Sequence, residues 1–100
     1  MKLVVNSDAQ VDLLKAARFY EKQERGLGDR VVLFLREKMV QLTTVPGVHP
    51  TRWGFYQAVV DGDFPYYVIY YTLEQNVLRV RAILDHRRDP KRIRRWLRKR

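Results

Sequence analysis

The main change in the periodicity of apolar residues along this chain falls at Pro46-Gly47. Between Ser7 and that point, apolar residues recur every three or four positions, which is typical of α-helices. Beyond it, runs rich in aromatic and β-branched residues are separated by turn residues, as in antiparallel strands. Helices that precede the main strands favour an α+β fold in which the helices cover one face of the sheet. At 100 residues, we expect a single domain spanning residues 1–100.

Two helices are predicted between Ser7 and Pro46. Ser7 and Gln10 have the S-x-x-Q spacing of a capping box, so we expect the first helix to begin at Asp8 and Gly26 to end it. The apolar side of this helix is expected to hold Leu13, Leu14, Ala16, Ala17 and Tyr20.

The second helix is expected after a short connection, with Gly28 or Asp29 as its cap and its end near Thr43. A connection this short makes the two helices an antiparallel pair. Leu33 and Val40 project away from the apolar side of this helix. Either the domain covers the helix on two sides, or these two residues belong to a docking groove for a partner helix. The apolar side itself includes Val31, Val32, Leu35, Met39 and Leu42.

Three strands joined by tight turns are predicted after Gly47, and together they form an antiparallel meander. They cover Phe55–Val60, Phe64–Tyr71 and Val77–Leu84. The short apolar run Lys2–Val5 is expected to add a further strand to the same sheet. Alternation along the third strand predicts two faces. One face holds Val80, Ala82 and Leu84, and the other holds Arg79, Arg81 and Ile83.

Positive charge is concentrated at the C-terminus. The chain carries a net charge of +9, of which residues 87–100 supply +8, with nine basic side chains and one acid. Either this segment is a solvated tail that keeps the protein soluble, or it attracts a polyanion or an acidic protein. Asp89 as a cap and Pro90 as a first residue predict a short basic helix over about 90–100. Its narrow apolar stripe of Ile93, Trp96 and Leu97 can pack on the domain or on a partner.

Several classes of chemistry are excluded by composition. The chain has no cysteine, so it has no disulfide framework, thiol nucleophile or cysteine-ligated metal site. Two histidines are too few for a histidine metal site, and we expect no metal and no cofactor. Ser7 is the only serine and has the position of a cap, which argues against a serine hydrolase. No apolar run is long enough for a membrane span, and we expect a cytoplasmic protein without a membrane partner.

One set of residues near the predicted sheet could support metal-free chemistry on a phosphodiester. Guanidinium groups can hold a phosphate and stabilise transition-state charge, while a histidine or tyrosine can move the proton of a ribose hydroxyl. Tyrosines in a strand are also common core residues, and arginines on a sheet are commonly solvated. The set comprises Arg52, Arg79, Arg81, His86, Arg87 and Arg88, with Tyr66, Tyr67, Tyr70 and Tyr71.

Three stretches, in this order, resemble the RelE/ParE superfamily of bacterial type II toxins, and ParE-type members in particular. They are Ala16–Tyr20 (AARFY), Phe64–Tyr71 (FPYYVIYY) and Ala82–Pro90 (AILDHRRDP). The ending formed by His86, Arg88, Asp89 and Pro90 is the most specific part. The resemblance runs from the first strand to Pro90 and implies the same α+β fold. It also implies a toxin whose expression inhibits bacterial growth.

The resemblance further implies a cognate antitoxin, acidic and partly disordered until bound, that forms a hetero-oligomer with the toxin. Such antitoxins typically wrap the helix pair and the sheet with a helix and a strand. The residues expected to bind the antitoxin are Leu33, Val40, Arg94, Arg95 and Trp96.

The superfamily has two kinds of target. ParE-like members poison DNA gyrase, and RelE-like members are ribosome-dependent, metal-independent mRNA endonucleases. The chain has no lysine between Lys38 and Lys91, whereas several RelE-type sites depend on lysines in the sheet. Arg52, Arg81 and His86 could take the place of those lysines. We expect gyrase as the target, with the endonuclease as the alternative and a nontoxic basic binding module derived from the fold as a third; only the endonuclease would make the protein an enzyme. The expected target contacts are Arg52, Arg79, Arg81, His86, Arg87 and Arg88, and the nuclease set would be His86, Arg81, Arg52 and Tyr70.

Overall fold

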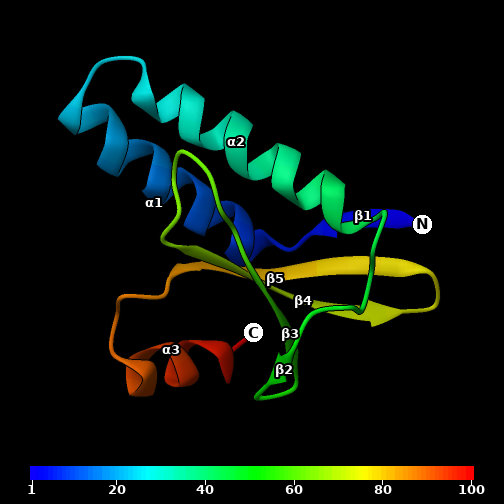
Figure 1. The fold of residues 1–100 in the computed structure, drawn as a ribbon. Coiled ribbons are helices and arrows are strands. Elements are labelled where there is room, and N and C mark those ends of the chain that lie inside the picture. The colour runs from blue at the N-terminus through cyan, green and yellow to red at the C-terminus, as the bar shows by residue number, and fades with distance from the viewer.

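Helices lie on both faces of a five-stranded sheet in the computed structural model, which describes residues 1–100 (Figure 1). The strands are ordered β1-β5-β4-β3-β2, with β1 parallel to β5 and all other neighbours antiparallel. The α+β fold predicted from the sequence is confirmed. The elements in chain order are β1 (Lys2–Val5), α1 (Ser7–Gln23), α2 (Leu27–Leu42), β2 (Thr51–Arg52), β3 (Phe55–Val59), β4 (Tyr67–Glu74), β5 (Val77–Asp85) and α3 (Pro90–Leu97).

The antiparallel helix pair starts differently from the prediction at both N-termini. Asn6 occupies the N-cap position of α1, and no side chain accepts a hydrogen bond from the first amides of this helix. The Gln10 side-chain amide instead donates to the Val5 carbonyl oxygen at 3.0 Å, so the predicted capping box is wrong. Gly26, at φ +92°, is the cap of α2, and Gly28 lies inside that helix. A Cβ on Gly28 would stand 2.7 Å from the Ala17 carbonyl oxygen, so a glycine is required there for close helix packing.

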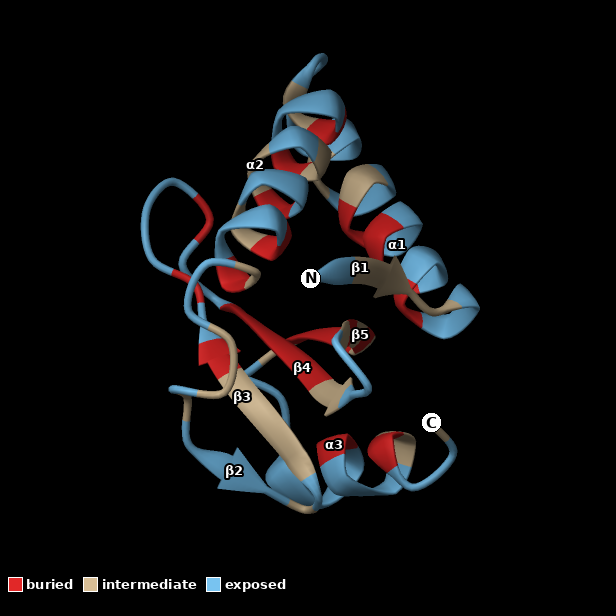
Figure 2. Cartoon of the chain, turned by 90° about the vertical axis from the view of Figure 1, so that its right-hand side faces the viewer, coloured by how far each residue is buried: buried red, intermediate tan, exposed pale blue.

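The main core lies between the helix pair and the sheet, and the residues facing it are buried (Figure 2). Val31, Leu35, Met39 and Leu42 of α2 are buried as predicted. Leu14 of α1 is not: 56% of it is exposed, because the sheet-facing side of that helix is centred on smaller residues and an acid. The buried residues of α1 are Ala9, Asp12, Leu13 and Ala16.

Strand β4 begins three residues later than predicted. Phe64 precedes it in a turn, where its buried ring packs edge-on against Tyr20 and Phe34. Burial of an aromatic side chain therefore produced a strand-like pattern in a segment that is not a strand.

The two faces predicted for β5 are also wrong, because the strand is irregular. The register against β4 shifts between Tyr70 and Tyr71, which pair with Ala82 and Val80, so Arg81 has no partner residue. This bulge reverses the alternation that follows it. Val80 and Ile83 accordingly lie in the main core, whereas Ala82 and Leu84 lie in a second cluster on the opposite face.

Helix α3 covers that opposite face, so the sheet is covered by helices on both sides rather than one (Figure 1). Asp89 caps the helix by accepting from the Lys91 amide at 3.0 Å, and Pro90 is its first residue, as predicted. Ile93 and Leu97 are buried against a cluster formed by Val68, Tyr70, Ala82 and Leu84. None of the three helices combines the length and the apolar character needed to span a bilayer.

Candidate functional site

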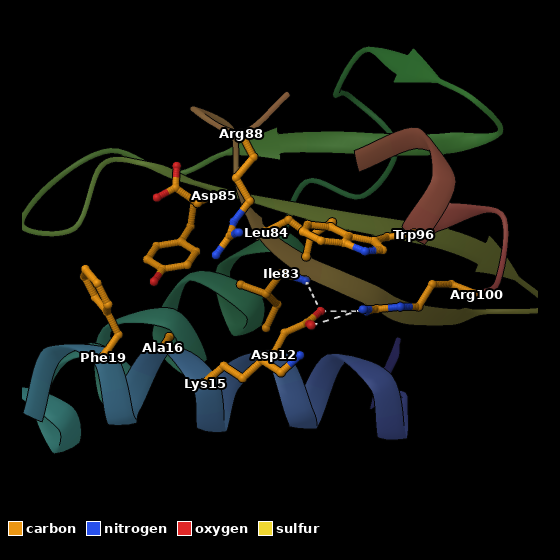
Figure 3. Close-up of a pocket in the computed structure, with 11 residues that line it drawn as sticks. Asp12, Lys15, Ala16, Phe19, Ile83, Leu84, Asp85, Arg88, Trp96 and Arg100 are labelled. Atoms are coloured by element: carbon orange, nitrogen blue, oxygen red, sulfur yellow. Dashed lines mark hydrogen bonds and ion pairs between the residues drawn. The ribbon is translucent and has the colours of Figure 1, made fainter. Parts of the chain in front are cut away.

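An open strand edge lies where α1, β5 and α3 meet. Strand β1 ends at Val5 beside Val80, so the second half of β5 has no neighbouring strand on that side. The carboxylate of buried Asp12 accepts from the Ile83 amide at 3.0 Å and from two nitrogens of Arg100 at 2.6 and 3.1 Å (Figure 3). Arg100 also donates to the Arg81 carbonyl oxygen at 3.2 Å. Two side chains thus satisfy backbone groups that a sixth strand would otherwise bind.

The Asp12–Arg100 pair forms part of the lining of a hollow of about 420 Å³ beside this edge. The hydrogen bond and charge of Asp12 raise the pKa of the Arg100 guanidinium. Figure 3 shows Phe19 on α1, Arg88 after β5 and Trp96 on α3 around the same hollow. The Arg88 guanidinium lies 5.4 Å from the centre of the Trp96 ring. The site therefore combines aromatic walls with charges of both signs.

The turn that follows β5 carries three of the predicted target residues. Arg87 donates to the Asp85 carboxylate at 2.7 Å and stacks over the Tyr66 ring at 3.7 Å. The hydrogen bond from Arg87 holds the pKa of Asp85 below its usual value. His86 and Arg88 are exposed, and neither forms an ion pair. These two side chains, unlike Arg87, are free to contact another molecule.

A second hollow, of about 260 Å³, brings together Arg52, Tyr70 and His86. Arg52 has no carboxylate partner; its guanidinium stacks on Trp53 at 4.0 Å. Tyr70 is buried under this hollow, and burial raises the pKa of its phenol. Ile93 of α3 forms part of the wall, so the C-terminal helix borders this site as well.

Arg79 and Arg81 do not join that group. Arg81 donates to the Thr72 hydroxyl at 3.0 Å and to the Glu74 carboxylate at 2.9 Å, while Arg79 donates to the Asn6 side chain at 3.2 Å. All of these partners lie at the ends of β4 and β1, away from the residues that line the second hollow. Three of the four side chains of the predicted nuclease set, Arg52, Tyr70 and His86, therefore lie together, and Arg81 does not.

The four tyrosines around β4 are divided between environments by strand alternation. Tyr66 is exposed beside His86, and Tyr70 lies in the second cluster. Tyr67 and Tyr71 lie in the main core, and burial raises the pKa of Tyr67 to about 12. The Tyr71 hydroxyl accepts from the Gly47 amide at 3.0 Å. Tyr71 therefore serves the core, whereas Tyr67 belongs to the core and also lines the first hollow.

A separate apolar groove of about 520 Å³ runs between β1, α1 and α2. Val40, 57% exposed, lines it together with Leu14 and Val32. Leu33 is 60% exposed on the same helix but does not line the groove. The unexpected exposure of Leu14 thus extends the apolar surface around Val40.

The other residues predicted to bind an antitoxin lie on α3, across the sheet from this groove (Figure 1). Arg94 and Arg95 are exposed, and Trp96 is half-buried against the second cluster. A single partner that contacts both Val40 and Arg94 therefore has to extend around the sheet.

Asp12 and Arg100 are the site residues that the sequence analysis missed. Asp12 carried a usable signal, since it lies three residues after Ala9 and four before Ala16 on the buried side of α1. An acid among apolar residues at helical spacing requires a partner. No group of three or more His, Cys, Asp or Glu side chains in the chain is arranged to hold a metal ion.

Comparison with known proteins identifies a family. The family model described as the ParE toxin of the type II toxin-antitoxin system, parDE, matches residues 3–90. A search of the curated proteins finds no match. The matched span begins in β1 and ends at the first residue of α3. It therefore includes the strand residues that line the two hollows and all residues that line the apolar groove.

Proposed function

This chain belongs to the ParE toxin family of type II toxin–antitoxin systems, and we propose that it inhibits DNA gyrase. The proposal is supported by the position of Arg81, whose guanidinium is held by Thr72 and Glu74. Without it, the nuclease set lacks one of the two guanidinium groups expected to stabilise phosphodiester cleavage. Gyrase inhibition requires a binding surface and no assembled catalytic group.

The exposed residues Arg52, His86 and Arg88 are proposed to contact the target. None of the three has an ion-pair partner within the chain, so these side chains are available to another molecule. Arg79, Arg81 and Arg87 are proposed to act indirectly, because each is held by a side chain of the domain itself.

A supercoiling assay with purified gyrase tests the proposal. Wild-type protein is expected to block supercoiling, and the double variant Arg52→Ala/Arg88→Ala to require at least about tenfold more protein, equivalent to about 1.4 kcal/mol. The control Arg18→Ala/Arg30→Ala removes the same charge from exposed, unpaired arginines of the helix pair. Full supercoiling in the presence of excess wild-type protein would refute the gyrase proposal.

An mRNA endonuclease of RelE type is the second candidate, because Arg52, Tyr70 and His86 share one hollow. Codon-positioned cuts in mRNA on translating ribosomes, with supercoiling intact, would favour it. In that case His86→Ala is expected to abolish cleavage while leaving the thermal unfolding midpoint unchanged, since His86 is exposed.

A type II toxin has an antitoxin as its partner, and we propose that the antitoxin places an apolar helix in the groove beside Val40. Val40→Asp is expected to weaken binding of the protein encoded by the neighbouring reading frame by at least about tenfold. Val48→Asp is the matched control, because Val48 is 69% exposed and does not line the groove. Equal binding by both variants and wild type would place the antitoxin elsewhere.

A further inference from the structure

The outer side of α3 carries a set of basic side chains that the domain itself does not use. Six of them are exposed, and none forms an ion pair. Within the same segment, Arg87 is paired with Asp85 and Arg100 with Asp12. The six are Lys91, Arg92, Arg94, Arg95, Arg98 and Lys99.

No acid of the domain neutralises this set. Asp89 is the only acidic residue in residues 87–100, and its carboxylate accepts from the Lys91 backbone amide as the helix cap. The charges therefore act outward, and the like-charged side chains repel one another until a polyanion binds.

The spacing of these charges suits a nucleic-acid backbone. A helix rises about 1.5 Å per residue, so the eight residues of α3 extend about 12 Å and carry four cations, about one every 3 Å. Each strand of duplex DNA carries one negative charge per about 3.4 Å of its axis. Four of the six cations are arginines, whose planar guanidinium groups bind phosphate through two hydrogen bonds.

The arrangement around the helix suits a duplex groove rather than a flat surface. At about 100° per residue, Arg92 lies on one flank of α3, and Arg94 and the C-cap residue Arg98 lie on the other. Arg95 lies between the flanks, opposite the buried Ile93 and Leu97. The major groove of B-DNA is wide enough for an α-helix, so cations on both flanks can reach the phosphates on either side of it.

The same face offers little apolar surface. None of the large exposed apolar residues of the protein lies on α3, so binding to this face depends mainly on charge. Trp96, its only aromatic residue, packs against the second cluster and lies beside Arg88 at the first hollow, so the outer side of α3 itself carries no aromatic ring for the bases of a single strand to stack on.

We propose that α3 binds the phosphate backbone of duplex DNA without reading its base sequence. The helix is held against the sheet by Ile93 and Leu97 in the second cluster and by the Arg100–Asp12 pair. The inference goes beyond the proposed function, and binding requires neither gyrase nor antitoxin.

Fluorescence anisotropy with a labelled 20-base-pair duplex of arbitrary sequence tests the inference across about 50 to 200 mM salt. The logarithm of the binding constant falls with the logarithm of the salt concentration by about 0.9 per phosphate contact. The triple variant Arg94→Gln/Arg95→Gln/Arg98→Gln is therefore expected to reduce this slope by about 2.7.

The control triple variant Lys22→Gln/Arg25→Gln/Arg30→Gln removes the same charge from exposed residues at the far end of the helix pair. It is expected to keep the wild-type slope, and circular dichroism checks that both variants fold. Equal losses in the two variants, or no binding at 50 mM salt, would overturn the inference. The inference would also be overturned if polyglutamate displaced the duplex as readily as unlabelled DNA at equal charge. The same holds for duplex RNA, because its A-form major groove is too narrow for a helix. A supercoiling assay on the same variants keeps this outcome separate from that of the gyrase proposal.

Discussion

Removal of the Asp12 side chain is expected to be the most damaging single change outside the apolar core. Asp12→Ala leaves the Ile83 amide without an acceptor at the open edge of β5. It also leaves Arg100, whose side chain is only 15% exposed, without its partner. Both effects occur at a site with little access to water, where neither group can recover its lost interaction in full.

The magnitude follows from these two losses. An unsatisfied buried amide costs about 1–3 kcal/mol, and breaking a buried ion pair from one side costs about 3–5 kcal/mol. Because the Arg100 side chain is already 15% exposed and can turn further toward solvent, we expect about 3–4 kcal/mol for Asp12→Ala, less than the sum of the two losses. Asp12→Asn keeps an oxygen for the Ile83 amide, so its cost should be clearly smaller.

Urea denaturation followed by circular dichroism measures these free energies of unfolding. Asp8→Ala is the matched control, because Asp8 is 59% exposed and lies 3.8 Å from the Arg100 guanidinium. A solvent-exposed ion pair is worth about 0–1 kcal/mol, so that variant should remain close to wild type. If Asp12→Ala lost no more stability than Asp8→Ala, the buried pair would not be what secures the edge of β5.

Three further predictions concern other parts of the fold. Gly28→Ala should lower stability by about 1–3 kcal/mol in urea denaturation, despite the higher helix propensity of alanine, because the new Cβ would contact the Ala17 carbonyl. The hydrogen bond from Arg87 lowers the pKa of Asp85 in the folded protein. Asp85 therefore stabilises the fold in full at pH values above 3.8, the ordinary pKa of an aspartate. The stability advantage of wild type over Asp85→Asn should therefore disappear as the pH falls through that lower pKa, which denaturation at stepped pH measures. In an ultraviolet titration, Tyr67→Phe should remove a phenol that is still protonated at about pH 11, since burial raises its pKa to about 12.

The order of helices and strands, apart from the two-residue strand β2, could be predicted because each of the longer elements is encoded locally. The side of α2 that packs on the sheet follows from helical spacing alone, and Asp89-Pro90 marks the start of α3 directly. The faces of β5 could not be predicted, because one unpaired residue, Arg81, reverses an alternation that is otherwise regular. Nothing in the residue types at 80–84 distinguishes a regular strand from a bulged one.

The candidate sites could be predicted only in part, for a related reason. Arg52, Tyr70 and His86 come from three separate segments, and the sheet topology brings them to one hollow. The partners that remove Arg81 from that group, Thr72 and Glu74, are visible in the sequence, but their proximity depends on the register of β4 against β5. A strand pattern can thus predict where a basic residue lies in the sheet. Whether its side chain is free to bind another molecule depends on which residues the neighbouring strand places beside it.

Arg100 and the basic residues of α3 have different roles in the C-terminal segment. Arg100 pairs with Asp12 inside the domain, whereas the exposed basic residues of α3 form no ion pair and can bind another molecule. An isolated helix of eight residues is unstable in water, and repulsion between its four cations weakens it further. The helix therefore depends on the buried side chains of Ile93 and Leu97 and on the single arginine that turns inward to Asp12. Because these contacts hold the helix backbone against the sheet, its remaining basic side chains all extend from one ordered surface. A mobile tail of the same composition would have to lose conformational entropy before it could match a duplex, whereas α3 has already done so on folding.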